Sequence, residues 1–156
     1  MYLICFGLKI EDELKQSKFQ SNMHKAVVNI MFTSGWVYNQ FRDIFKSYQL
    51  THQQYNVLRI LRGRHPEALN PSDIKSVMLD KNPDLTRLCD RLCEMGYIER
   101  EVNVENKRKM NIKINDKGLE ILKEIDPLME VFNNSKFDLT EEEAILLSNL
   151  LDKVRG

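Results

Sequence analysis

The chain has 156 residues, of which 42% are hydrophobic and 29% charged, so it can bury a core and is not intrinsically disordered. Its 23 basic residues are balanced by 23 acidic residues, which excludes overall positive charge as a source of affinity for nucleic acids. Any such affinity has to come from a local patch of charge.

Three cysteines, Cys5, Cys89 and Cys93, form no CxxC pair and are odd in number, which favours a reduced protein over a disulfide-linked one. The apolar start, MYLICFGLKIEDEL, lacks the basic region and the cleavage site of a signal peptide. No apolar run has the length of a membrane span. We therefore expect a soluble, cytoplasmic protein that does not bind membranes.

The first predicted element is a long helix over residues 21–47, where apolar residues recur at steps of three and four. Gly35 lowers the helix propensity inside this pattern but does not end it. A second helix is predicted to begin at Thr51, whose hydroxyl can cap it with Gln54 as the capping-box partner.

Two short helices follow, and an Asn-Pro pair precedes each. Asn70 is predicted to cap the third helix, because the next residue is a proline that fits the first helical position. Asn82 and Pro83 repeat this arrangement for the fourth helix, with Asp84 near the positive end of its dipole. Gly96 is the expected C-terminal stop. Together the two helices predict a helix-turn-helix.

After Gly96 the apolar period changes to two, which predicts a hairpin with strands near residues 98–102 and 110–114. Its connection, NVENKR, is polar and longer than a minimal turn, so the tip should project. A helix-turn-helix followed by such a hairpin is a winged helix.

The C-terminal part is predicted to be helical. Asn115 can cap a helix that Pro127 should kink or divide, and Thr140 with Glu143 forms a capping box for the last helix. This last helix carries more apolar surface than one small domain usually needs.

The fourth helix carries the candidate DNA contacts. With Leu85 at the centre of its buried face, Arg87 and Arg91 fall on the opposite side. A recognition helix presents mainly its N-terminal part to the major groove, so Asp84, Thr86 and Arg87 are candidates for base edges and Arg91 for a phosphate. Alternatively, the two arginines pair with nearby carboxylates on a solvated helix.

Three consecutive cations, Lys107, Arg108 and Lys109, lie at or beside the predicted hairpin tip. Arginine fits a narrow, electronegative minor groove when the neighbouring helix occupies the major groove. A charged turn is also ordinary surface chemistry, so this cluster gains meaning only beside the fourth helix.

The segments LTHQQYNVLRIL, LTRLCDRLCEMGYIER and NKRKMNIKINDKG resemble successive segments of the MarR family of bacterial transcriptional regulators. The resemblance extends over residues 50–118 and implies a mainly α-helical winged helix-turn-helix with a small β-hairpin wing. It also implies three parts: an N-terminal segment and dimerisation helix (1–49), a DNA-binding lobe (50–114) and C-terminal dimerisation helices (115–156).

The resemblance further implies a homodimer that binds a palindromic double-stranded DNA operator, acts as a repressor and is released by a small, often aromatic effector. Arg108 would be the wing arginine that reaches the minor groove. The family commonly has aspartate two residues before this arginine, whereas this chain has Asn106, which can cap a turn but carries no charge to hold Arg108.

Candidates for regulation lie elsewhere in the chain. Trp36, Tyr38 and Tyr55 could line an effector pocket, although aromatic residues at helical spacing more often belong to a core. Some relatives sense oxidants through an N-terminal cysteine, which makes Cys5 a redox candidate. A thiol in apolar surroundings is usually inert, and for Cys89 and Cys93 we expect a core role.

The scattered histidines lack the spacing of metal ligands, and no Walker loop, GxSxG, HExxH or GxGxxG motif occurs. We therefore expect neither an enzyme nor a metal or other cofactor. The main alternative to DNA binding is a winged helix that binds another protein, which the zero net charge permits.

Overall fold

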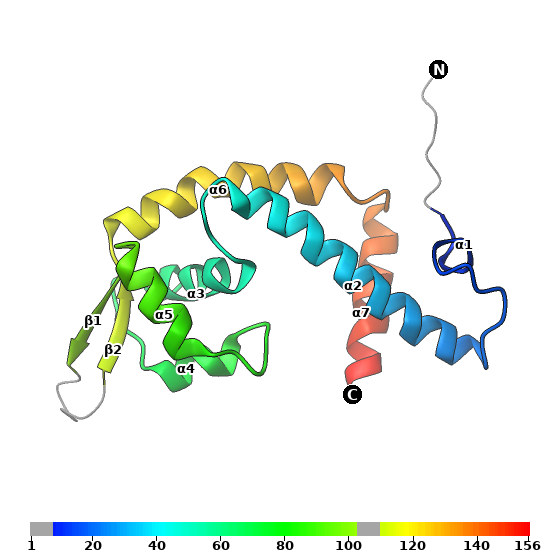
Figure 1. Ribbon diagram of the computed structural model, residues 1–156, viewed down its shortest axis with the longest axis horizontal. Coiled ribbons are helices and arrows are strands. Elements are labelled where there is room, and N and C mark those ends of the chain that lie inside the picture. Colours follow the sequence, from blue (N-terminus) through cyan, green and yellow to red (C-terminus); the bar gives the residue numbers. More distant parts are fainter. Residues whose placement is uncertain (1–7, 103–109) are drawn as a thin grey trace, which may run out of the picture. The chain divides into compact units, whose positions relative to one another are not determined.

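The computed structural model describes residues 8–102 and 110–156, and the chain divides into two compact units, Met1–His52 and Gln53–Gly156. The described residues are mainly helical with one two-stranded antiparallel sheet, which confirms the predicted fold class (Figure 1). The elements are α1 (Ile10–Glu13), α2 (Asn22–Lys46), α3 (His52–Arg62), α4 (Pro71–Val77), α5 (Leu85–Glu94), β1 (Ile98–Val102), β2 (Met110–Ile114), α6 (Asp116–Ser135) and α7 (Glu141–Arg155).

The first unit consists of the short helix α1 and the long helix α2. The hydroxyl of Ser21 caps α2 by accepting a hydrogen bond from the backbone N–H of His24 at 3.1 Å, and the helix runs through Gly35 as predicted. An ion pair between Lys25 and Glu11 joins the two helices. Sequence periodicity did not predict α1, because a single helical turn is too short to show a period.

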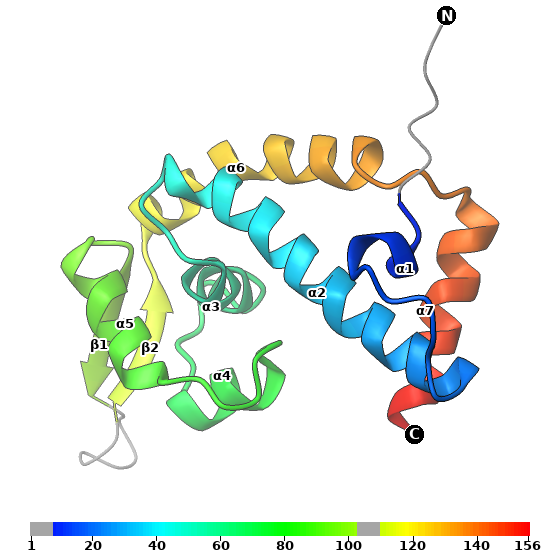
Figure 2. The ribbon, with the colours of Figure 1, turned by 45° about the vertical axis from the view of Figure 1, so that its right-hand side comes forward.

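The second unit is built around an apolar core. Helices α3, α4 and α5 lie beside the hairpin, and α6 continues directly from β2 (Figures 1 and 2). Burial of one face of each element removes apolar surface from water and drives this assembly. The fully or almost fully buried side chains include Leu58, Leu61, Ile74, Leu92, Ile98, Ile112, Ile114, Leu122 and Ile125.

The predicted hairpin is present. Strands β1 and β2 pair antiparallel, with Ile98 opposite Ile114 and Val102 opposite Met110. Ile98 and Ile114 are buried, but Val102 and Met110 are exposed. The end of the hairpin nearest its connection therefore does not pack on the core, although its apolar residues alternate there too. Leu69 exchanges two backbone hydrogen bonds of 2.8 Å with Ile112, which adds one residue of a third strand beside β2.

The predicted start of the fourth helix is wrong by two residues. The cap of α5 is Asp84 and not Asn82, because the Asp84 carboxylate accepts the backbone N–H of Arg87 at 3.1 Å. The backbone N–H of Asn82 instead donates to the carboxylate of Asp80 at 2.9 Å, which holds residues 80–82 in a turn before the helix. The cap at Asn70 is confirmed, since its side chain accepts the N–H of Asp73.

The C-terminal helices follow the predicted caps. Asn115 caps α6, and Thr140 with Glu143 forms the capping box of α7. Helix α6 is not divided at Pro127 but runs without interruption from Asp116 to Ser135. Buried side chains on both sides of the proline, Ile125 and Phe132, anchor the two halves and offset the missing hydrogen bond.

Within the described part of the chain, no helix combines the length and the apolar character that crossing a membrane requires.

Candidate nucleic-acid interface

Helix α5 presents the side chains that the sequence predicted for it. Leu85, Cys89 and Leu92 are buried against the rest of the second unit. Thr86 and Arg87 lie exposed on the first turn, directly after the capping residue. The N-terminal half of α5 therefore offers a hydroxyl and a guanidinium to solvent, and both groups can form hydrogen bonds with base edges in a major groove.

The charged side chains of α5 differ in their partners. The Arg91 guanidinium donates to the Glu94 carboxylate at 2.9 Å, as the alternative of a solvated helix predicted. Among the described residues, Arg87 has no ion pair or side-chain hydrogen bond. Both groups of the Arg91–Glu94 pair are more than half exposed, so this pair is weak and Arg91 can exchange it for a phosphate. The Arg87 guanidinium is available without breaking an ion pair or a hydrogen bond to any described residue.

The C-terminal end of α5 is held by residues at the β2–α6 junction. The Lys117 ammonium donates to the carbonyl of Met95 at 2.8 Å, and the Asn115 amide donates to the carbonyl of Gly96 at 3.1 Å. A cation at this place also interacts favourably with the negative end of the helix dipole. The backbone of Gly118 approaches the Tyr97 carbonyl so closely that an added Cβ would lie 2.2 Å from that oxygen. Helix α5 is therefore anchored firmly to the start of α6.

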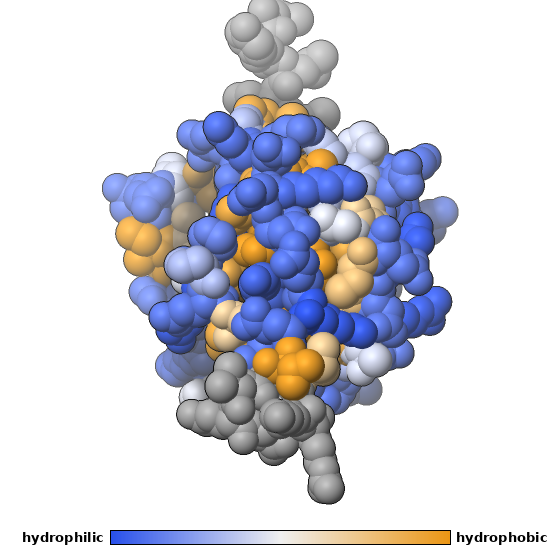
Figure 3. Space-filling view, turned by 90° about the vertical axis from the view of Figure 1, so that its left-hand side faces the viewer, coloured by the Kyte–Doolittle hydropathy of each residue, from blue (hydrophilic) through white to orange (hydrophobic). Residues whose placement is uncertain are grey.

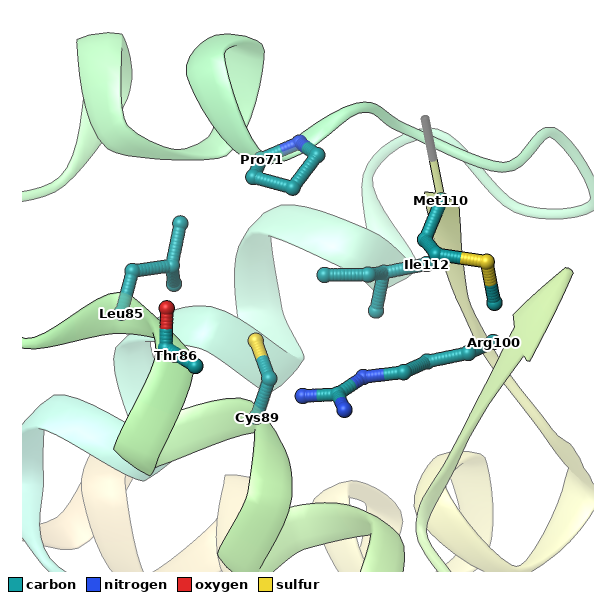
Figure 4. A pocket seen from close by; sticks show the side chains of 7 residues that line it. All are labelled: Pro71, Leu85, Thr86, Cys89, Arg100, Met110 and Ile112. Carbon is teal, nitrogen blue, oxygen red and sulfur yellow. The ribbon is translucent and has the colours of Figure 1, made fainter. Parts of the chain in front are cut away.

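A second contact joins α5 to the hairpin. The Arg100 guanidinium on β1 donates to the Asp90 carboxylate on α5 at 2.6 Å. Beside this contact lies a pocket of about 200 Å³ between α4, α5 and the two strands (Figure 4). It is lined by Pro71, Leu85, Thr86, Cys89, Arg100, Met110 and Ile112. The sequence did not predict this pocket, because its walls come from segments that are far apart in the chain.

The face that carries the hairpin is mostly hydrophilic (Figure 3). Hydrophobic side chains also reach this surface (Figure 3). At the outer ends of the strands, Val102 and Met110 are exposed. On the outer side of the hairpin, Lys113 lies between Glu99 at 3.7 Å and Glu101 at 3.4 Å. The base of the hairpin is thus close to neutral, and a basic character has to come from α5 or from residues 103–109.

The comparisons with known proteins agree with this geometry. The family model described as MarR family matches residues 50–110. The multiple antibiotic resistance protein MarR of Escherichia coli is 30% identical over 107 residues, which cover 67% of this chain and 73% of that protein. The chain belongs to the MarR family. The transcriptional regulator PecS of Dickeya dadantii is 29% identical over 113 residues, which cover 71% of this chain and 68% of PecS.

Solved structures of MarR proteins share the fold. A cysteine-to-serine mutant of E. coli MarR in complex with operator DNA superposes with a TM-score of 0.70 at 23% identity, covering 94% of this chain and 99% of that one. BpsR of Bordetella bronchiseptica, whose DNA binding is regulated by 6-hydroxynicotinic acid, gives a TM-score of 0.73 at 20% identity, with 81% and 89% covered. Membership of the MarR family identifies the chain as a winged-helix transcriptional regulator and not an enzyme.

The wing cations of this MarR-family chain, Lys107, Arg108 and Lys109, lie outside the described residues, as do Asn106 and Cys5. The described thiols are not activated. Burial raises the pKa of Cys89 to about 11 and also raises the pKa of Cys93. Both thiols are therefore protonated at neutral pH. The core role predicted for both is confirmed for Cys89, which is buried, whereas Cys93 is only partly buried.

The three aromatic candidates for an effector pocket lie in different units. Trp36 and Tyr38 are partly exposed on α2, where Tyr38 makes an edge-on contact with the ring of His52 at 5.1 Å. Tyr55 is only 4% exposed and belongs to the second unit, with the guanidinium of Arg59 over its ring. None of the three lines the pocket beside α5. Within the described ranges, no three side chains of the metal-binding types converge.

Proposed function

We propose that this chain is a homodimeric repressor that binds a palindromic double-stranded DNA operator through α5 and the wing. The observation that carries the proposal is the exposed first turn of α5, where Arg87 has no ion-pair partner among the described residues and stands beside Thr86. A guanidinium with no ion pair to a described residue can form a bidentate contact with guanine without first giving up such a pair.

The remaining contacts follow from the position of each side chain on the lobe. Arg91, one turn after Arg87, is proposed to exchange Glu94 for a DNA phosphate. Asp84 supports this surface as the cap of α5, since its carboxylate already accepts the N–H of Arg87. Lys107, Arg108 and Lys109 are proposed to enter the adjacent minor groove.

The exposed apolar side chains of α7 support the dimer. This helix of 15 residues contains no buried residue, which is unusual for an amphipathic helix in water. Its exposed aliphatic side chains are Ile145, Leu146, Leu147, Leu150 and Val154. A second copy of the chain would cover them and double the number of DNA contacts, which compensates for a lobe of nearly zero charge. Two recognition helices about 34 Å apart would then enter successive major grooves.

Regulation by a small aromatic effector is part of the proposal, and the regulation of BpsR by 6-hydroxynicotinic acid supports it. An effector would act by binding more tightly to a dimer whose two lobes have the wrong spacing for the operator. Trp36 and Tyr38, both partly exposed on α2, remain candidates for its contacts, whereas Tyr55 is buried within the second unit. A redox response through Cys5 is the alternative, and the raised pKa of Cys89 and Cys93 speaks against these two thiols as the sensors.

The test starts with selection of bound fragments from the source genome, followed by titration of the selected duplex at several salt concentrations. Arg87→Ala should weaken binding by about 1–3 kcal/mol per subunit and relax the preference for one base pair. Lys123→Ala on α6 is the matched control, because it also removes one exposed cation and should leave the affinity nearly unchanged. A wild-type chain without salt-dependent duplex binding would favour the protein-binding winged helix.

A further inference from the structure

The ion pair between Asp90 and Arg100 links the two elements that are proposed to enter the two grooves. Asp90 lies on α5 and Arg100 on β1, ten residues apart, and their closest nitrogen and oxygen atoms are 2.6 Å apart. The other described ion pair of α5, Arg91–Glu94, stays within the helix and orients nothing outside it. Among the described ion pairs, Asp90–Arg100 is thus the one that relates the helix to the wing.

Apolar packing does not fill the space between the hairpin and the N-terminal half of α5. The pocket of about 200 Å³ lies there, with Leu85 and Thr86 on the helix side and Met110 and Ile112 on the strand side. Figure 4 shows the side chain of Arg100 extending from β1 across this space toward Cys89. Arg100 therefore spans a gap that apolar side chains leave open between the helix and the strands.

We propose that Arg100 and Asp90 are positioning residues that fix the wing relative to α5, so that both groove contacts form on one duplex without a rearrangement. The inference rests on the proposed DNA binding. Arginine suits this role, because its planar guanidinium holds a carboxylate in a defined direction. If the wing is already fixed relative to α5, less conformational entropy is lost when the lobe binds DNA. In a dimer this saving applies to both lobes.

The test compares Asp90→Asn, Arg100→Gln, the double variant and the exchanged pair D90R/R100D in operator titrations at several salt concentrations. Each single variant should bind roughly tenfold more weakly with an unchanged salt slope, and the double variant should be no weaker than either single one. The exchanged pair should recover part of the affinity. Glu99→Gln is the matched control, since it removes one negative charge from the other side of β1 and should not weaken binding.

A direct phosphate contact by Arg100 would give a different pattern and would overturn the proposal. In that case Arg100→Gln would lower the salt slope by about one per subunit, and Asp90→Asn would strengthen binding because it frees a cation. Single variants that bind like the wild type would overturn it as well. Circular dichroism identifies a variant that fails to fold, and Arg100→Lys then serves as the milder variant, with an intermediate loss expected.

Residual dipolar couplings of the DNA-free protein provide a second readout that does not depend on the proposed function. In the wild type, the amides of α5 and of β1 should share one alignment, whereas in Arg100→Gln the hairpin should show reduced order relative to α5. Equal couplings in both proteins would overturn the proposal. A wild-type chain that binds no DNA but loses this order in the variant would refute the proposed function and leave the positioning role intact.

Discussion

Gly118 shows how much a single residue can restrict this fold. A Cβ at this position would lie 2.2 Å from the Tyr97 carbonyl oxygen and 2.7 Å from the Ile114 side chain. Gly118→Ala should therefore lower the free energy of unfolding by about 2–3 kcal/mol or more, measured by urea denaturation. Gly35→Ala is the control, because nothing lies within 4 Å of its Cβ and an exposed helical alanine should stabilise by about 0.5–1 kcal/mol. Equal stability of both variants would contradict the close approach.

Cys89 makes the stability depend on pH in the alkaline range. Burial raises the pKa of its thiol from 9.0 to about 11, so the folded protein retains this proton at pH values where the unfolded chain loses it. The contribution is complete below pH 9 and is lost as the pH rises through 11, amounting to about 1 kcal/mol between pH 8 and pH 10. Urea denaturation in reductant should show this extra decline in the wild type.

The comparison for this pH effect is Cys89→Ala, which retains all other titrating groups of the chain. The two proteins should differ in stability at pH 8 because of the lost packing, and this difference should shrink toward pH 10. A difference that stays constant over this range would mean that the thiol ionises in the folded protein as easily as in the unfolded one.

At the scale of one element, α5 depends on the cap that positions its first turn. Asp84→Ala leaves the backbone N–H of Arg87 without its partner, which should cost about 1 kcal/mol of stability and allow the turn with Thr86 and Arg87 to fray. Asp84→Asn removes the same charge but retains a good capping oxygen. The two variants therefore separate the effect of capping from that of charge, and thermal unfolding with operator titration measures both. Equal losses in both variants would assign the effect to charge.

At the scale of the whole molecule, α7 is expected to hold the dimer together. Leu150 is 52% exposed, so Leu150→Asp should leave the subunit folded while it introduces a charge into the proposed interface. Analytical ultracentrifugation should then detect monomers, and operator affinity should fall at least roughly tenfold because the two half-sites no longer bind together. Ser148→Asp, on the side of α7 opposite Leu150, is the control and should remain dimeric.

The sequence allowed prediction of those features whose causes lie within a few residues. Asn70, Asn115 and the Thr140–Glu143 pair are caps that act over three positions, and each is confirmed. The cap of α5 was assigned wrongly because Asn82 and Asp84 are both good caps. In the structure Asp84 is the cap, since its carboxylate accepts the N–H of Arg87, while residues 80–82 form a separate turn before the helix.

The candidate site was predictable only in part, because some of its contacts join residues that are far apart in the sequence. The exposure of Arg87 and Arg91 follows from helical period, whereas the pairing of Arg91 with Glu94 depends on side-chain rotamers. The contact between Asp90 and Arg100 joins a helix to a strand, and the pocket beside it combines α4, α5 and both strands. No local pattern records such contacts, and only the tertiary structure brings them together.

The single strand residue Leu69 has a consequence for self-association. Because Leu69 occupies the outer side of β2, the free edge of the described sheet is β1. An unpaired edge can recruit a strand from another molecule, and carboxylates along it discourage such pairing. Glu99 and Glu101 on β1 thus give the wing a built-in protection against aggregation, and variants that exchange both for β-branched apolar residues are expected to lose solubility before they lose their fold.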